Sequence, residues 1–270
     1  MTVFESLMDK LAEKGTLHFS LLDPDKVTVD KFIELAKGAE KAGSDALMIG
    51  GSYGVNESTL DNYIDAVKQE VKLPVILFPG SVAGLSKRAD AVLFLSVLNS
   101  TDPYYIIGAQ VQAAVLMAKR FSNLESIPMA YIIVGEGGAV GFASYAKPIP
   151  FHMEDVIVAY ALAAYYMGFS IVYLEAGSGA REPVPSSVVA KVKRAVRNKV
   201  LMVGGGIRSP EAAYSIALAG ADVVITGTVI EESPAIVLKD IVDAVHRGGQ
   251  RKLNNSGENA NRQVNVKRNN

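Results

Sequence analysis

The sequence predicts a single-domain (β/α)8 barrel, also called a TIM barrel. Eight short apolar runs alternate with segments of helical periodicity over 270 residues, a length that suits one such barrel with a short appendage. Most of these runs are continuously apolar, which is typical of parallel strands buried on both faces. Eight alternations of strand and helix favour a closed barrel over an open doubly wound sheet.

The elements follow one another in a regular order. The expected strands cover residues 17–22, 46–49, 75–78, 91–95, 129–134, 171–174, 200–203 and 223–225. The expected helices cover residues 1–14, 29–42, 57–70, 103–121, 154–167, 186–197, 210–219 and 235–245. Gly43, Gly168 and Gly220 end three of these helices, as residues that readily adopt the left-handed conformation. Residues 80–88 carry the weakest helical pattern.

Composition excludes several classes of function. The formal charge of −1 argues against a broad nucleic-acid-binding surface, and the absence of cysteine excludes disulfides, cysteine–zinc sites and thiol catalysis. The three histidines are far apart in the sequence, so a histidine-rich metal cluster is not expected. No apolar run reaches the roughly 18 residues of a membrane helix, and the first residues do not resemble a signal peptide. We therefore expect a cytoplasmic protein.

The last 24 residues differ from the rest of the chain. Residues 247–270 contain six Lys or Arg, one acid and seven Asn, a net charge of +5 in a chain whose total is −1. They contain almost nothing apolar, so we expect a disordered, basic, Asn-rich tail after a barrel domain at residues 1–246. A solvated tail is one interpretation. Weak peripheral contact with anionic lipid headgroups of a membrane is the other.

Two loops late in the chain carry the pattern of a phosphate site. The triple glycine 204–206 follows the seventh expected strand and leads to a helix start at Ser209. Gly227 and Thr228 follow the eighth. Glycine lets backbone N–H groups approach an oxyanion, and the loops after strands seven and eight of such barrels often bind phosphate. Tight turns alone would explain either loop, but the two in this order favour phosphate binding.

The loop after the sixth strand adds a carboxylate. Glu175 ends that strand, and Gly177 and Gly179 flank Ser178. A carboxylate at this position can accept a proton from a substrate alcohol, which makes Glu175 a candidate general base. A solvated glutamate in a flexible loop is the alternative.

The loops after the first two strands are candidates for a metal site. Asp23 follows the first strand, and Ser52 lies in the loop after the second. Carboxylate and hydroxyl oxygens suit Mg²⁺, which keeps several waters, although two protein ligands form a complete site only if a diphosphate supplies others. Asp23 before a helix is equally what a simple turn requires.

Taken together, these loops resemble the geranylgeranylglyceryl phosphate synthase family. The resemblance spans roughly residues 15–245. It rests on six segments in order: Leu22-Asp-Pro-Asp-Lys26, Gly50-Gly-Ser-Tyr-Gly54, Phe78-Pro-Gly-Ser81, Tyr173-Leu-Glu-Ala-Gly-Ser-Gly179, Val203-Gly-Gly-Gly-Ile-Arg-Ser209 and Thr226-Gly-Thr228. The combination is specific, whereas many phosphate-binding barrels share the triple glycine.

The resemblance implies an Mg²⁺-dependent prenyltransferase of ether-lipid biosynthesis. It would join the geranylgeranyl group of geranylgeranyl diphosphate to the sn-3 hydroxyl of sn-glycerol 1-phosphate, the first ether bond of archaeal-type membrane lipids. Asp23 and Ser52 would hold the metal, Glu175 would act as the base, and Tyr173 would orient the polyol. The implied substrate-binding residues are Tyr173, Leu174, Glu175, Ala176, Gly177, Ser178, Gly179, Gly204, Gly205, Gly227 and Thr228.

The same resemblance leaves three points open. Some relatives have a lysine two places before the metal aspartate, where this chain has Leu21, so no lysine contact with the substrate is carried over. Relatives form dimers or hexamers, which implies a homo-oligomer without fixing its size. Residues 104–107 and Val111 could line an apolar groove for the prenyl chain, or they could simply pack a helix on the barrel.

Three other functions compete with this one. A synthase of the same family could use a longer prenyl diphosphate, and groove length would discriminate. A phosphosugar isomerase would need an acid and a base that face each other, as Asp23 and Glu175 could, but it gives the Ser52 loop no role. A non-catalytic phosphate-binding barrel would not need the two carboxylates.

Overall fold

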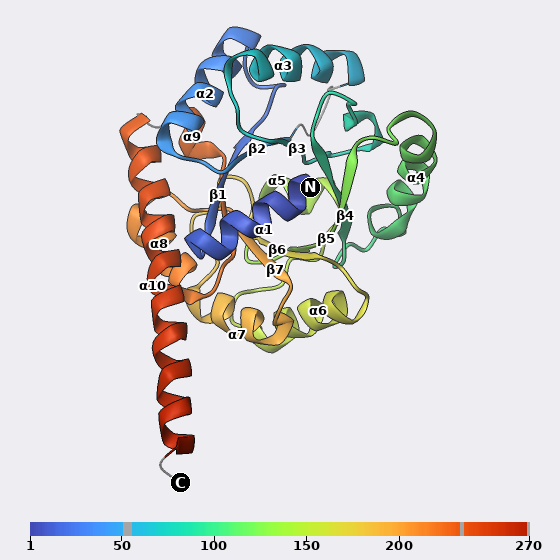
Figure 1. Cartoon of the computed structure of the whole chain (residues 1–270). Helices are drawn as coiled ribbons and strands as arrows, with labels where there is room; N and C mark the ends of the chain where they lie inside the picture. Colours follow the sequence, from blue (N-terminus) through green and yellow to red (C-terminus); the bar gives the residue numbers. More distant parts are fainter. Residues whose placement is uncertain (51–55, 233–234, 269–270) are drawn as a thin grey trace.

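The chain folds into a closed barrel of parallel strands surrounded by helices (Figure 1). The structure is a computed structural model that describes residues 1–50, 56–232 and 235–268. Each strand in these ranges pairs with the next, and the last pairs with the first. The strands are β1 (Leu17–Leu22), β2 (Ala46–Ile49), β3 (Val75–Leu77), β4 (Ala91–Val97), β5 (Glu125–Ile133), β6 (Ile171–Glu175), β7 (Val200–Gly204) and β8 (Val223–Thr226). The predicted (β/α)8 barrel is confirmed.

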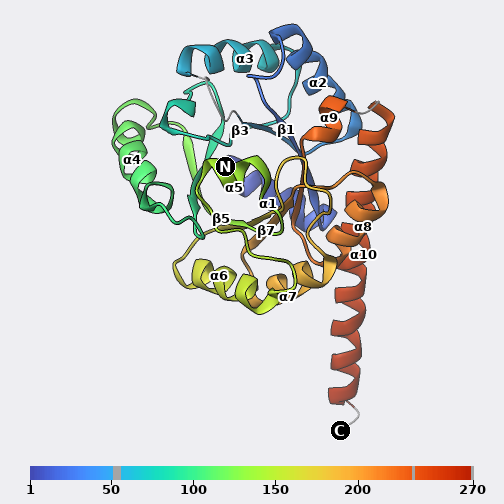
Figure 2. The same ribbon diagram turned by 180° about the vertical axis from the view of Figure 1, so that it is seen from behind.

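Most of the helices surround the barrel, whereas α1 and α5 lie at its two ends (Figure 1 and Figure 2). The helices are α1 (Val3–Lys14), α2 (Val29–Ala42), α3 (Glu57–Glu70), α4 (Ala109–Arg120), α5 (Gly138–Ala143), α6 (Glu154–Tyr166), α7 (Ser186–Val196), α8 (Pro210–Ala219), α9 (Thr228–Glu232) and α10 (Ala235–Arg268). Ser209 caps α8 as expected, because its side chain accepts a hydrogen bond from the Ala212 amide at 3.2 Å. Among the described helices, none is both long enough and apolar enough to cross a bilayer.

Helix α1 closes the amino-terminal end of the barrel. In Figure 1 it lies across the barrel, and Phe4, Met8 and Leu11 pack against the apolar side chains of the barrel interior. Its first amides donate to the Glu125 carboxylate at the start of β5, from Val3 at 2.6 Å and from Phe4 at 3.1 Å. Figure 2 looks onto the opposite end, where α5 and the loops after the strands lie. The open end of the barrel is therefore the end where the strands finish.

Three connections differ from the expectation. Residues 80–88 form only a short 3-10 turn, η1 (Val82–Gly84), so β3 and β4 are joined without an α-helix. The segment before α4 is a π-helical turn, η2 (Tyr104–Gly108). The loop after β5 also contains α5, which the sequence pattern did not indicate, because its six residues are too short to show a periodicity.

The expected start of the tail, at residue 247, falls inside a helix. Helix α10 continues through this boundary to Arg268. A β-carbon on Gly248 would lie 2.7 Å from the Tyr214 carbonyl oxygen, so α10 passes very close to α8. Gly249 lies equally close to the turn between α1 and β1, at Gly15 and Thr16. The folded domain therefore extends beyond residue 246.

Polar contacts hold the same stretch of α10. The Lys252 ammonium group donates to the Ala221 carbonyl at 2.8 Å and lies 3.6 Å from the Asp222 carboxylate. Asp222 in turn accepts from the Leu201 amide at the start of β7 at 2.8 Å. Burial lowers the pKa of Lys252, and the charge of Asp222 opposes that shift. Amino-acid composition could not predict this docking, because glycine and lysine are common in disordered tails as well as at close helix contacts.

Close packing at Gly249 predicts a clear loss of stability in Gly249→Ala. The added methyl would overlap the Thr16 amide, and overpacking of this kind costs about 1–3 kcal/mol. That corresponds to a fall of roughly 2–4 °C in Tm for each kcal/mol. Gly38→Ala in α2 is the matched control, because nothing lies within 4 Å of its β-carbon position. Equal Tm values for the two variants would show that α10 is not docked at Gly249.

Candidate active site

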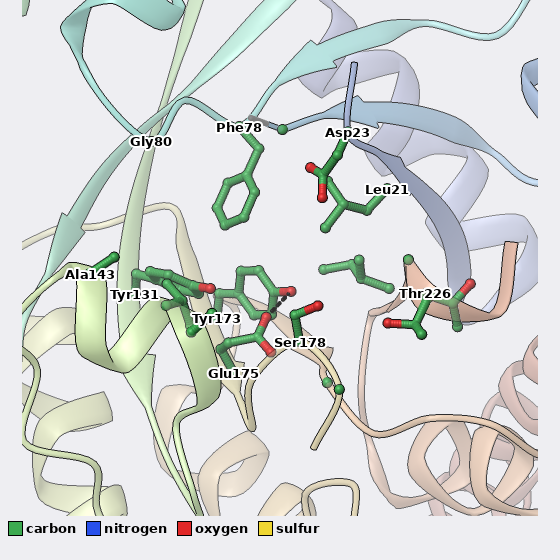
Figure 3. A pocket seen from close by; sticks show the side chains of 18 of the residues that line it. Leu21, Asp23, Phe78, Gly80, Tyr131, Ala143, Tyr173, Glu175, Ser178 and Thr226 are labelled. Atoms are coloured by element: carbon green, nitrogen blue, oxygen red, sulfur yellow. Dashed lines mark hydrogen bonds between the residues drawn. The ribbon is translucent and has the colours of Figure 1, made fainter. Parts of the chain in front are cut away.

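One cavity of about 340 Å³ opens at the carboxyl ends of the strands. Its residues come from the strands β1, β4, β5, β6 and β8, from the loops after the strands and from α5 (Figure 3). In Figure 3, Tyr131, Tyr173 and Glu175 gather on one side, and Asp23 and Leu21 lie on the other. The pocket therefore joins the loops that the sequence analysis singled out.

Glu175 is the buried carboxylate of this pocket. It ends β6 and is 5% exposed. The Tyr173 hydroxyl donates to one carboxylate oxygen at 2.6 Å, and the Gly177 amide donates to the other at 2.7 Å. Tyr131 supplies a further hydrogen bond from the neighbouring strand β5. A buried carboxylate needs such donors, because burial without them is very costly.

The surroundings change the acidity of all three groups. Burial raises the pKa of Glu175, although the hydrogen bonds from Tyr173, the Gly177 amide and Tyr131 oppose this shift. Burial and the nearby Glu175 charge raise the pKa of both tyrosines well above the ordinary value. The hydroxyls therefore remain protonated donors near neutral pH. A carboxylate with a raised pKa is a better base than an exposed one.

Strand register explains how these side chains meet. Tyr131 pairs with Tyr173 across β5 and β6, and their ring centroids are 4.9 Å apart. Phe78 completes the aromatic cluster, with its ring centroid 5.4 Å from that of Tyr131. Glu175 lies two residues beyond Tyr173, so both side chains point to the same face of the strand, into the barrel.

The first two glycines of the triple glycine make room for this pair. Glu175 is in register with Gly204 on β7, and a β-carbon on Gly204 would overlap the Tyr173 hydroxyl. A β-carbon on Gly205 would lie 2.5 Å from a Glu175 oxygen, and Gly205 also has a positive φ of 84°. These glycines are thus required by the packing of Tyr173 and Glu175, in addition to any ligand.

Seven of the residues predicted to bind substrate line the pocket. They are Tyr173, Glu175, Ser178, Gly179, Gly205, Gly227 and Thr228. The other four, Leu174, Ala176, Gly177 and Gly204, lie behind them. The Leu174 and Ala176 side chains pack into the apolar layer between strands and helices. Thr228 begins the short helix α9 directly after Gly227.

Asp23 lies at the opposite edge of the pocket. Its carboxylate pairs with the Lys26 ammonium group at 2.5 Å. A β-carbon on Gly50 would lie 2.5 Å from an Asp23 oxygen, so the end of β2 comes close to this carboxylate. Ser52, the other predicted metal position, lies outside the described residues. Asp23 therefore lines the pocket beside Lys26, a residue that the sequence pattern did not single out.

The wall between these two sides is apolar. Phe78, Leu95, Val97, Tyr105 and Val140 line it. Of the residues suggested for a prenyl groove, Tyr105 reaches the pocket. Ile107 and Val111 do not, because they are 58% and 59% exposed on the outer face of η2 and α4. These two residues therefore neither line a groove in the pocket nor pack the helix on the barrel.

A buried histidine supports the floor of the site. His18 on β1 is bonded to the Thr226 hydroxyl at 2.9 Å and to the Ser44 hydroxyl at 2.9 Å. Burial lowers the pKa of His18 to about 3, so the ring is neutral. Thr226 lines the pocket, but its hydroxyl is bonded to His18. His18 is therefore a structural polar group.

Tyr131 is the main residue that sequence reasoning missed. It lies within a continuously apolar strand, where a tyrosine looks like any other core side chain. The available signal was its spacing, because tyrosines occur in both β5 and β6, but the register that aligns them is a property of the folded barrel.

The fold and the site define the chain as a (β/α)8 barrel with an enzyme-like pocket at the carboxyl ends of its strands. Comparison with known proteins makes this class specific. The chain belongs to the PcrB family, because the sequence pattern of that family matches residues 8–246.

Similar proteins cover nearly the whole chain. A geranylgeranylglyceryl phosphate synthase of Caldivirga maquilingensis is 92% identical over 267 residues, which cover 99% of this chain and 100% of that one. The enzyme of the same name from Thermofilum pendens is 51% identical, over 90% of this chain and 94% of that one. A crystal structure of (S)-3-O-geranylgeranylglyceryl phosphate synthase from Thermoplasma acidophilum, in complex with substrate sn-glycerol-1-phosphate, has a TM-score of 0.86 and 41% identity. That comparison covers 92% of this chain and 99% of that one.

The contact between Gly204 and Tyr173 predicts a coupled pair of substitutions. Gly204→Ala should destabilise the protein by about 1–3 kcal/mol, because the methyl overlaps the tyrosine hydroxyl. The Tyr173→Phe variant lacks the hydroxyl oxygen that the methyl overlaps. In that background, Gly204→Ala should therefore lower the free energy of unfolding by clearly less. Urea unfolding of the wild type, both single variants and the double variant measures this. Additive free energies would show that Gly204 is not required by Tyr173.

Proposed function

We propose that this protein transfers the geranylgeranyl group of geranylgeranyl diphosphate to the sn-3 hydroxyl of sn-glycerol 1-phosphate. The observation that carries the proposal is the position of Glu175. This buried carboxylate lies where the glycine-rich loops meet the apolar wall of one cavity. An alcohol bound by the loops and a prenyl carbon on the apolar wall would both be next to it. The names of the similar proteins support this assignment.

The acceptor belongs on the side of β6, β7 and β8. Ser178, Gly179, Gly205, Gly227 and Thr228 line that side, and they can offer backbone amides and hydroxyls to a phosphate. With the phosphate there, the glycerol hydroxyls would point towards Tyr173 and Glu175. The glycerol phosphate in the Thermoplasma acidophilum structure supports this choice of acceptor.

The diphosphate belongs on the side of β1 and β2. Asp23 is the carboxylate at this edge, and no group of three or more His, Cys, Asp or Glu suited to a metal occurs among the described residues. A single carboxylate fits Mg²⁺ that keeps waters and takes other ligands from substrate phosphates. Asp23, with Ser52, would hold the ion. Bound Mg²⁺ would neutralise charge on the leaving diphosphate.

The chemical step then balances without a further reactant. The acceptor oxygen forms a bond to the first carbon of the prenyl chain, and the bond from that carbon to the diphosphate oxygen breaks. The electron pair of the broken bond leaves with diphosphate, and the hydroxyl proton passes to Glu175. The apolar wall, including Phe78 and Tyr105, excludes water that would otherwise compete for the prenyl carbon.

An isomerase is the weaker alternative. Asp23 and Glu175 do face one cavity, but Lys26 pairs with Asp23 at 2.5 Å. The wall between the two carboxylates is apolar, and a phosphosugar carries polar groups along its whole length. The wall instead suits a hydrocarbon chain, whether that chain has 20 carbons or more.

Assembly and location complete the proposal. An outer apolar stripe on η2 and α4, formed by Ile107, Val111 and Val115, is more than half exposed and fits a homo-oligomer, either a dimer or a hexamer. We propose a cytoplasmic protein in peripheral contact with membranes, because its proposed donor and product are both lipids.

The proposed reaction predicts a specific ether product. Protein, Mg²⁺ and sn-glycerol 1-phosphate are mixed with prenyl diphosphates of 15, 20 and 25 carbons, and mass spectrometry detects the ether. We expect the 20-carbon product to form fastest. Glu175→Gln should remove most of the activity, since loss of a general base typically costs about 10²–10⁴-fold. No ether with any donor would sink the proposal.

Removal of the Asp23 charge predicts a selective loss of turnover. Asp23→Asn should lower kcat by at least ~100-fold, because the metal supplies several kcal/mol of stabilisation to the leaving group. Calorimetry should find binding of sn-glycerol 1-phosphate unchanged. Asp25→Asn, an exposed change in the same loop, is the control. If Asp23→Asn matches that control in kcat, Asp23 is a turn residue.

A further inference from the structure

Arg208 connects two loops of the pocket. It follows the triple glycine after β7, and its guanidinium group reaches the loop after β6. One terminal nitrogen donates to the Ala180 carbonyl at 2.8 Å, and the other lies 3.2 Å from the Gly179 carbonyl. A planar guanidinium group offers two neighbouring carbonyls a fixed fork of donors, which the compact ammonium group of lysine lacks.

The tip of the loop that Arg208 holds has little other packing. Ser178 and Gly179 are exposed, and nothing lies within 4 Å of the β-carbon position of Gly179. Gly177 and Gly179 both have positive φ, at 110° and 76°, a conformation that glycine adopts readily and other residues rarely do. The base of the loop is held by the bond from the Gly177 amide to Glu175, by a turn bond from the Ala180 amide to the Gly177 carbonyl and by the burial of Ala180. The approach of Gly138 to Ser178 is a further support.

Arg208 is also placed to favour an anion. Among the described residues that line the pocket, the cationic ones are Lys26 and Arg208. Lys26 pairs with Asp23 on the diphosphate side, whereas Arg208 lies with the glycine-rich loops. A guanidinium group has five N–H donors, and the two carbonyls take two of them. The remaining donors can face a phosphate between the two loops.

We propose that Arg208 is the positioning residue of the acceptor phosphate site. It ties Gly179 and Ala180 to the triple-glycine loop, so that Ser178, Gly179 and Gly205 are held around one phosphate group. The inference rests on the proposed function, because that function places a glycerol phosphate here. It assigns to Arg208 a role that a charge alone would not fulfil.

Two substitutions of Arg208 separate the effect of its hydrogen-bond geometry from the effect of its positive charge. Arg208→Lys keeps the positive charge but loses the planar fork, and Arg208→Gln loses both. Arg194→Lys is the matched control, because Arg194 is an exposed arginine on α7 that also donates to a backbone carbonyl, that of Ala190 at 3.3 Å. Calorimetry measures binding of sn-glycerol 1-phosphate and of inorganic phosphate, steady-state kinetics gives KM for each substrate, and a thermal scan gives Tm.

The account predicts that Arg208→Lys weakens binding of sn-glycerol 1-phosphate by about tenfold or more, the scale of a lost hydrogen bond from a charged group. Binding of inorganic phosphate should weaken in parallel. KM for the prenyl diphosphate should stay at the wild-type value, as in Arg194→Lys. Wild-type affinity in Arg208→Lys would overturn the positioning role. An equal rise in both KM values with a lower Tm would also overturn it, in favour of a general structural role. If the wild type itself bound no glycerol phosphate, the proposed function would fail first.

Discussion

The hydrogen bond from the Tyr173 hydroxyl to the Glu175 carboxylate is the interaction on which the pocket depends. The Glu175 carboxylate lies inside the barrel, where burial opposes its ionisation. Groups on the neighbouring strands and loops offset this desolvation cost. Tyr131 on β5 and the Gly177 amide donate to the same carboxylate. On β7, Gly204 and Gly205 leave the space that the tyrosine and the carboxylate fill. The triple glycine is therefore part of the support for Glu175 as much as a place for a phosphate.

The same interaction divides the mouth of the barrel into two halves. On the side of β6 to β8, backbone and hydroxyl groups surround a space suited to a small phosphorylated alcohol. On the side of β1, Asp23 and Lys26 supply a carboxylate and an ammonium group, which suit the diphosphate and metal that we propose there. An apolar wall joins the halves, and Glu175 lies at the boundary. A transfer between two phosphorylated substrates, one of them with a hydrocarbon chain, makes use of all three surfaces.

Much of this arrangement could be predicted from the sequence, because it depends on local patterns. Continuous apolar runs predicted the strands, and the glycine-rich loops after β6 and β7 indicated the side on which we propose that the acceptor phosphate binds. What could not be predicted depends on contacts between distant segments. Tyr131 becomes part of the site only through its register with Tyr173. Helix α10 continues past residue 246 because Gly249 fits against the turn at Thr16, a contact that composition does not reveal.

The most direct test of this account is a crystal structure of the protein with sn-glycerol 1-phosphate bound, in which the distance from the sn-3 hydroxyl to the nearest Glu175 carboxylate oxygen is measured. The account predicts a distance within the hydrogen-bond range of roughly 2.5–3.0 Å, with the phosphate between the loops after β6, β7 and β8. A phosphate bound instead at Asp23, or an sn-3 hydroxyl that points away from Glu175, would contradict the assignment of the base and of the acceptor side.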